Sequence, residues 1–120
     1  MKIAMAITQE NLQAKVNPTF GRTPYFLVFD TETKAATYQA NPAMNASGGA
    51  GIQAAQAIVD TGCEAVIAYR FGENAAKVIN GAQIKSYKAV DASAEENINK
   101  LIAGELSPLS DIHPGYHHAN

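Results

Sequence analysis

Three glycine-bearing segments of the chain combine residue types that suit the binding of an anion. They are residues 20–25 (FGRTPY), 41–51 (NPAMNASGGAG) and 69–74 (YRFGEN), and both arginines of the chain, Arg22 and Arg70, lie within them. The second segment comes just before a predicted helix, where free backbone N–H groups and the positive end of the helix dipole attract negative charge. A flexible glycine-rich loop without a ligand explains this segment equally well.

The distribution of carboxylates favours an anion site over acid–base chemistry. The chain of 120 residues carries 11 acidic and 9 basic side chains, but no carboxylate occurs between Asn11 and Phe29 or between Thr33 and Val59. The glycines at 48–51 lack the G-x-G-x-x-G spacing of a dinucleotide site, and no Lys-Ser or Lys-Thr pair completes a P-loop. A ligand here would be an anion that is not held as a typical dinucleotide. Polar loops without charge are also common, so this distribution alone leaves both explanations open.

The side chains that catalysis needs are scarce or badly placed. The three histidines, His113, His117 and His118, all fall near the C-terminus, where they suit adventitious binding of copper, zinc or nickel. The single cysteine, Cys63, follows a helix-ending glycine and is expected to be a small structural residue. Asp30 begins a predicted hairpin turn, and no pair of carboxylates stands at strand ends where metals could be held. We therefore expect that the protein is not an enzyme.

Composition excludes several further classes. The apolar run at residues 25–29 is far shorter than the roughly 20 residues of a membrane helix, and the N-terminus lacks the apolar stretch and cleavage site of a signal peptide. The formal net charge of −2 and the isoelectric point near 5.8 give no electrostatic footprint for nucleic acid. We expect a soluble, cytoplasmic protein without a nucleic-acid or membrane partner.

Patterning along the chain predicts an α/β domain over residues 1–106. Alternation and β-branched or aromatic residues predict strands at 2–7, 25–30, 35–40, 65–69 and 84–87. Helical spacing of apolar residues predicts helices at 52–61, at 73–80 and between a Ser93–Glu96 capping box and Gly104. The order β-β-β-α-β-α-β-α gives a mixed sheet covered by helices. Residues 107–120 have little periodicity and are expected to form a mobile tail.

Taken in order and with their spacing, the three segments resemble the dinitrogenase iron–molybdenum cofactor biosynthesis family. The matching strings are FGRTPYF at 20–26, NP at 41–42 and SGGAGIQAA at 47–55, followed by Gly72 and Asn74. The family's fold is ribonuclease-H-like, with a five-stranded mixed sheet whose second strand is antiparallel and with three helices. This agrees with the element order read from the patterning.

The resemblance implies non-covalent carriage of a molybdenum-containing sulfide cluster, without turnover, among cofactor-assembly or ATPase partner proteins. One branch, the orange proteins, holds a molybdenum–copper sulfide cluster; other relatives carry iron–molybdenum–sulfur precursors. Such a soft polyanion needs N–H donors, positive charge and polarizable walls rather than cysteine thiolates. The implied cofactor-binding residues are Phe20, Gly21, Arg22, Met44, Asn45, Ser47, Gly48, Gly49, Gly51, Arg70, Phe71 and Gly72.

Thr19 departs from the family's pattern. Nitrogenase-associated relatives often have a histidine at this position, implicated in cofactor binding, so imidazole ligation here is excluded and a strict iron–molybdenum carrier is disfavoured. Two alternatives remain. One is a ribonuclease-H-like nuclease or phosphotransferase, which needs strand carboxylates that 2–7 and 65–69 lack. The other is a small-anion or protein-interaction module.

Overall fold

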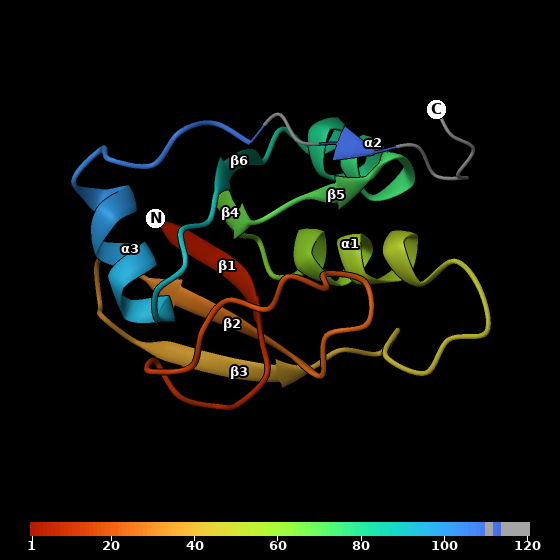
Figure 1. Cartoon of the computed structure of the whole chain (residues 1–120), viewed down its shortest axis with the longest axis horizontal. Helices are drawn as coiled ribbons and strands as arrows, with labels where there is room; N and C mark the ends of the chain where they lie inside the picture. The colour runs from red at the N-terminus through yellow and green to blue at the C-terminus, as the bar shows by residue number, and fades with distance from the viewer. Residues whose placement is uncertain (110–111, 114–120) are drawn as a thin grey trace.

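A five-stranded mixed sheet forms the centre of the computed structural model, which describes residues 1–109 and 112–113 (Figure 1). Its strands run in the order β3-β2-β1-β4-β6. They are β1 (Lys2–Ile7), β2 (Tyr25–Asp30), β3 (Ala36–Ala40), β4 (Ala65–Ala68) and β6 (Lys85–Lys88). Strand β2 is antiparallel to both of its neighbours, whereas β1, β4 and β6 are mutually parallel.

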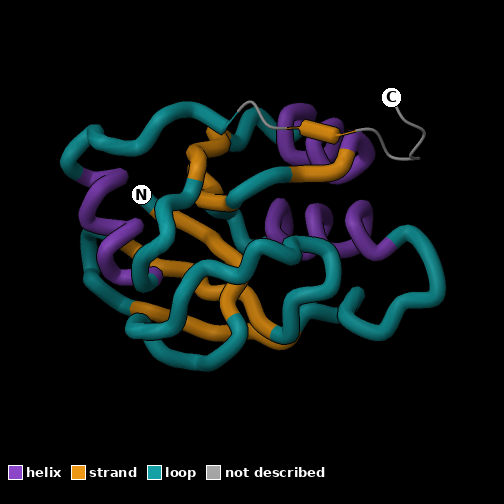
Figure 2. The backbone as a smooth tube through the Cα atoms, in the orientation of Figure 1, coloured by secondary structure: helices purple, strands orange, loops and turns teal. Residues whose placement is uncertain are grey.

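Three helices cover the two faces of this sheet (Figures 1 and 2). They are α1 (Ala50–Asp60), α2 (Glu73–Gly81) and α3 (Ala94–Ile102). Helices α1 and α2 pack on one face and α3 packs on the other, together with part of the long connection between β1 and β2. The expected α/β class, the five-stranded mixed sheet with an antiparallel second strand and the three helices are confirmed.

Alternating small and large residues along β1 face the two helix layers on opposite sides of the sheet. Ala4 and Ala6 point toward α1 and α2, whereas Ile3, Met5 and Ile7 point toward α3. Successive side chains of a strand face opposite sides of the sheet, so this short segment contributes to both cores. Small residues on the first face let two helices pack side by side against the strands.

A second, two-stranded sheet was not expected from the sequence. Strand β5 (Phe71–Gly72) pairs in parallel with β7 (Ile112–His113). In addition, Ser107 accepts a hydrogen bond from the Lys88 N–H, and the Leu109 N–H donates to the Ser86 carbonyl. Segments of two residues carry no readable period, so pattern analysis could not find them. The predicted mobility of 107–120 and the domain boundary at 106 stay predictions.

The N-terminus of α1 has an unusual backbone. Gly49, the residue before the helix, has φ of 67° and no side chain caps the first turn. This left-handed region is accessible to glycine at little cost but is strained for other residues. The preceding Gly48 does not have a positive φ, and a Cβ added there would meet no atom within 4 Å.

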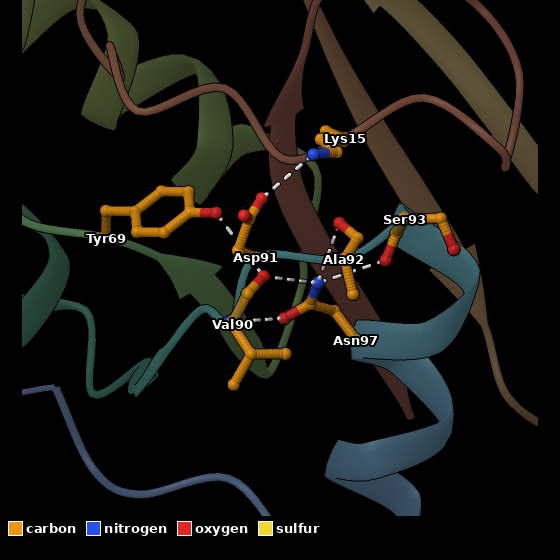
Figure 3. Close-up of polar contacts among 7 residues, drawn as sticks. All are labelled: Lys15, Tyr69, Val90, Asp91, Ala92, Ser93 and Asn97. Carbon is orange, nitrogen blue, oxygen red and sulfur yellow. Dashed lines mark hydrogen bonds and ion pairs between the residues drawn. The ribbon is translucent and has the colours of Figure 1, made fainter.

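The buried amide of Asn97 fastens the loop before α3 to the helix itself (Figure 3). Its Oδ1 accepts a hydrogen bond from the Val90 N–H at 2.9 Å, and its Nδ2 donates to the carbonyls of Val90, Ala92 and Ser93 at 3.0–3.3 Å. The Tyr69 hydroxyl also donates to the Val90 carbonyl. A single side chain thus satisfies polar groups of a loop that lies against the core.

Two side chains with reactive groups have structural roles. Asp30 Oδ1 accepts hydrogen bonds from the backbone N–H groups of Glu32 and Thr33, and the first of these is the main reason that the pKa of Asp30 is lowered. Cys63 is buried, and this desolvation raises the pKa of its thiol. The predicted turn and packing roles of these two residues are confirmed.

No helix among the described residues has the length and apolar character needed to cross a membrane.

Replacing Asn97 by alanine should destabilise the fold by about 2–4 kcal/mol, because the Val90 N–H and the Val90, Ala92 and Ser93 carbonyls lose the hydrogen bonds that this buried side chain makes. Urea denaturation measures the change. The matched control is Asn99→Ala, at an exposed position of the same helix, for which we expect less than about 0.5 kcal/mol. Equal losses in the two variants would contradict the structural role of Asn97.

Replacing Gly49 by alanine should cost about 1–2 kcal/mol, because the added Cβ strains the left-handed backbone. Gly48→Ala, one residue earlier, should be neutral or slightly stabilising because its surroundings are open. Thermal unfolding of both variants tests this difference, and an equally stable Gly49→Ala variant would show that the helix can start without a left-handed residue.

Candidate functional site

A cleft of about 460 Å³ opens where α1 and α2 begin. One wall is the first turn of α1 with Gly49, a second is the first turn of α2 with Gly72, and residues 18–21 of the β1–β2 connection form a third. In Figure 1, both helices begin on the right-hand side of the view. The lining residues are Pro18, Thr19, Phe20, Gly21, Gly49, Ala50, Gly51, Ile52, Arg70, Gly72, Glu73, Asn74 and Ala75.

The cleft is bordered by two helix N-termini that no side chain caps. In α1 the first helical hydrogen bond runs from the Gln53 N–H to the Gly49 carbonyl. The N–H groups of the preceding helical residues therefore have no acceptor within the helix. Each helix N-terminus also carries the equivalent of roughly half a positive charge. The backbone alone makes this cleft attractive to an anion.

Close packing of glycines sets the distance between two walls. A Cβ on Gly21 would lie 3.3 Å from the Gly51 nitrogen and 3.4 Å from its Cα, so any larger residue would push the two segments apart. A Cβ on Gly51 would instead make an ordinary contact of 3.8 Å with the Ala75 Cβ on α2. Gly21 is thus needed for packing, whereas Gly51 leaves space between the helices.

Arg22 holds a loop in place and is not part of the cleft lining. Its Nη1 donates to the Ala46 carbonyl at 2.7 Å and to the Met44 carbonyl at 3.4 Å. The guanidinium therefore braces the loop that leads to α1. We expected the Arg22 side chain to face the ligand. The structure instead places it against this loop, and this geometry supports a contribution to the site through the loop.

Arg70 is the cationic side chain among the described residues that line the cleft. It is exposed and stands directly before β5, two residues before the N-cap of α2. Glu73, the first residue of α2, is the carboxylate of the same lining. One positive and one negative side chain thus flank the start of this helix.

An aromatic cluster supports the cleft from behind. The rings of Phe20 and Phe71 meet edge to face with centroids 4.9 Å apart, and Phe20 also packs on Phe26 at 5.5 Å. Of these three buried residues, Phe20 lines the cleft, whereas Phe71 lies outside the lining. The cluster joins the first cleft segment to β2 and β5.

The structure brings together half of the residues expected at the site. Phe20, Gly21, Gly49, Gly51, Arg70 and Gly72 line the cleft. Phe71 is buried in the core, Arg22 braces the loop, and the remaining four lie on the exposed loop before α1 and are not part of the lining. These four are Met44, Asn45, Ser47 and Gly48.

The expected adventitious metal binding by the tail histidines stays a prediction, because these side chains fall outside what the structure describes. The backbone of His113 lies in β7, paired with Gly72 at the edge of the cleft. His117 and His118 lie outside the residues that the structure describes. Within residues 1–109 and 112–113 there is no group of three or more His, Cys, Asp or Glu residues that could hold a metal ion.

Asn41 is a positioning residue that the sequence analysis missed. Its buried Nδ2 donates to the carbonyls of Gly21 and Thr23, each at 2.9 Å, and its Oδ1 accepts from the Ala43 N–H at 2.9 Å. Thr23, fully buried, in turn donates from Oγ1 to the Ile7 carbonyl. The asparagine before a proline at the end of β3 was a usable turn signal. Among the other lining residues, Thr19 and Ile52 flank the expected segments and Glu73 lies within the segment 69–74, but none of them was among the expected binding residues.

Comparison with known proteins places this geometry in context. Among curated proteins, none matches the chain. The solved structure of the apo orange protein from Desulfovibrio gigas is similar over 92% of this chain and 93% of that chain, with a TM-score of 0.86 and 28% sequence identity. A Thermotoga protein provisionally assigned as NifB, of the DUF35 family, is similar over 99% and 97% of the two chains, with a TM-score of 0.79 and 26% identity.

A protein of Methanocaldococcus jannaschii that is provisionally assigned as a dinitrogenase shares the fold, with a TM-score of 0.70 and 24% identity over 92% of this chain and 96% of that chain. The family model described as dinitrogenase iron-molybdenum cofactor matches residues 1–104. The resemblance drawn from the three sequence segments is therefore confirmed, and the chain belongs to the dinitrogenase iron-molybdenum cofactor family.

Proposed function

We propose that the protein binds and carries a molybdenum-containing metal-sulfide cluster in the cleft at the start of α1 and α2, without turnover. The observation that carries this proposal is the meeting of two helix N-termini, neither capped by a side chain, in one cleft that also holds Arg70. Family membership points to the cofactor class, and the cleft supplies a chemical reason for it.

The donor set suits a cluster that brings its own sulfide ligands. The described cleft lining contains no cysteine or histidine, and Cys63 lies beyond the opposite end of α1, a helix roughly 16 Å long. Backbone N–H groups and a guanidinium can hydrogen bond to sulfide, and anions are stabilised at helix N-termini. Binding of this kind leaves the metal–sulfide bonds intact and is reversible.

Cluster composition forms the finer part of the proposal. Similarity to the orange protein at 28% identity favours a molybdenum–copper sulfide cluster over an iron–molybdenum–sulfur precursor. Thr19 supports the same choice, because this lining residue offers a hydroxyl at the position where the resemblance implies a histidine in nitrogenase-associated relatives. Cofactor-assembly or ATPase proteins are the proposed partners, and the cytoplasm the proposed compartment.

No observation favours the nuclease or phosphotransferase alternative. Strands β1 and β4 read KIAMAI and AVIA and have no carboxylate. We propose that the fold is ribonuclease-H-like because of its strand order. This likeness of fold does not imply metal-dependent hydrolysis. A small-anion module would use the same cleft, so it has to be separated by experiment.

Tetrathiomolybdate, with and without copper, should bind the purified protein, and binding should shift its visible charge-transfer band. Arg70→Gln should weaken binding about tenfold, because a charge-assisted hydrogen bond is lost at an exposed site. Lys85→Gln, an exposed cation on β6 outside the cleft lining, is the matched control and should bind like the wild type. Visible titration gives the affinities.

Gly51→Asp should weaken binding further by adding a carboxylate between the helix N-termini, whereas Gly81→Asp, in the last turn of α2, should not. If Arg70→Gln and Gly51→Asp leave affinity and spectrum unchanged, the cleft is not the cluster site. Sulfate binding as tight as that of tetrathiomolybdate would instead identify a small-anion module.

A further inference from the structure

Glu73 is chemically out of place in the proposed anion site. The described cleft lining contains a single carboxylate, that of Glu73, and a single cationic side chain, that of Arg70. The formal charges of these two described lining side chains cancel, so their sum gives the cleft no net attraction for an anion, and the two helix N-termini supply the remaining positive potential. A site selected only for strong anion binding would exclude this glutamate.

The two helix N-termini differ because of this residue. The first turn of α1 has no acidic side chain, whereas Glu73 occupies the first position of α2. A carboxylate in a first turn interacts favourably with the helix dipole. The same negative charge reduces the attraction of the α2 N-terminus for a bound anion, while the α1 N-terminus keeps its full effect.

We propose that Glu73 is a specificity-determining residue that biases the cleft toward anions of low charge, an inference that rests on the proposed cluster-binding function of the same cleft. Coulomb repulsion from a fixed carboxylate grows in proportion to the charge of the ligand. A dianion is thus penalised less than a more highly charged cluster, and each additional negative charge lowers the affinity by the same factor. Arg70 acts in the opposite direction, so the pair sets how steeply affinity depends on cargo charge.

Hexacyanoferrate(III) and hexacyanoferrate(II) are suitable probes because they have nearly the same size and shape but carry three and four negative charges. At a separation of roughly 10 Å in water of low ionic strength, removal of the Glu73 charge should raise affinity about twofold per unit of ligand charge. Glu73→Gln is therefore expected to bind the trianion about eightfold and the tetraanion about sixteenfold more tightly than the wild type. Isothermal titration calorimetry measures both.

The matched control is Glu96→Gln, which removes a carboxylate from the first turn of α3, on the other face of the sheet. Its affinities for both probes should equal those of the wild type. A structural effect of Glu73→Gln would change the two affinities by the same factor, and that result would overturn the inference. It would also be overturned if neither probe binds, or if Glu96→Gln reproduces the effect.

Failure of the proposed function gives a different pattern. In that case tetrathiomolybdate binding does not respond to Arg70→Gln, whatever the hexacyanoferrates do. A second pattern is that Arg70→Gln weakens tetrathiomolybdate binding while Glu73→Gln changes the affinities for the two hexacyanoferrates by the same factor. That result would support the cluster-binding cleft and contradict its discrimination by ligand charge.

Discussion

The close approach of Gly21 to the first turn of α1 is the constraint on which the cleft depends. Because a Cβ at this position would come within 3.3–3.4 Å of the Gly51 backbone, a larger residue here would force the loop after β1 and the helix start to move apart by a few tenths of an ångström. Asn41 holds the same contact from the other side through hydrogen bonds to the carbonyls of Gly21 and Thr23. Arg22 adds two further bonds to the loop that leads into α1. Several backbone segments, distant in sequence, are thereby fixed around one opening.

The sheet contributes to this arrangement through residue size. Ala4 and Ala6 on β1 and Ala68 on β4 face α1 and α2, while the larger Ile3 and Met5 face α3. Parallel strands β1, β4 and β6 require crossover connections, and α1 and α2 supply them on the same face. Two neighbouring helices that return in this way begin at the same edge of the sheet. Their N-termini therefore meet as a consequence of topology, before any side chain contributes to a site.

Regular periodicity explains which parts of the fold could be predicted. Strands such as 25–30 and the Ser93 cap of α3 have strong local signals, and Ser93 Oγ does accept a hydrogen bond from the Glu96 N–H. The pairing of Phe71–Gly72 with Ile112–His113 has none, because the partners are far apart in sequence and each is two residues long. At the candidate site, glycine and arginine types indicated three segments, and residues from each of them line the same cleft. The sequence could not show which arginine lines the cleft and which one holds a loop. Arg22 and Arg70 differ in their surroundings, since the fold places backbone carbonyls beside Arg22 and the cleft beside Arg70.

The same reasoning explains why scarcity of reactive side chains is compatible with a role in metal chemistry. A site built from thiolates or carboxylates would bind metal ions directly and would exchange a cluster's own ligands. A site built from backbone N–H groups has no lone pair to offer a metal and recognises only the anionic surface of what it holds. Its donors are fixed by the helices, so little side-chain ordering is needed on binding. Specificity must then come from shape and from the few charges at the opening. Arg70 and Glu73 are the two charged side chains of the described lining, and their opposite signs give the chain a means of adjusting affinity without altering the backbone that creates the site.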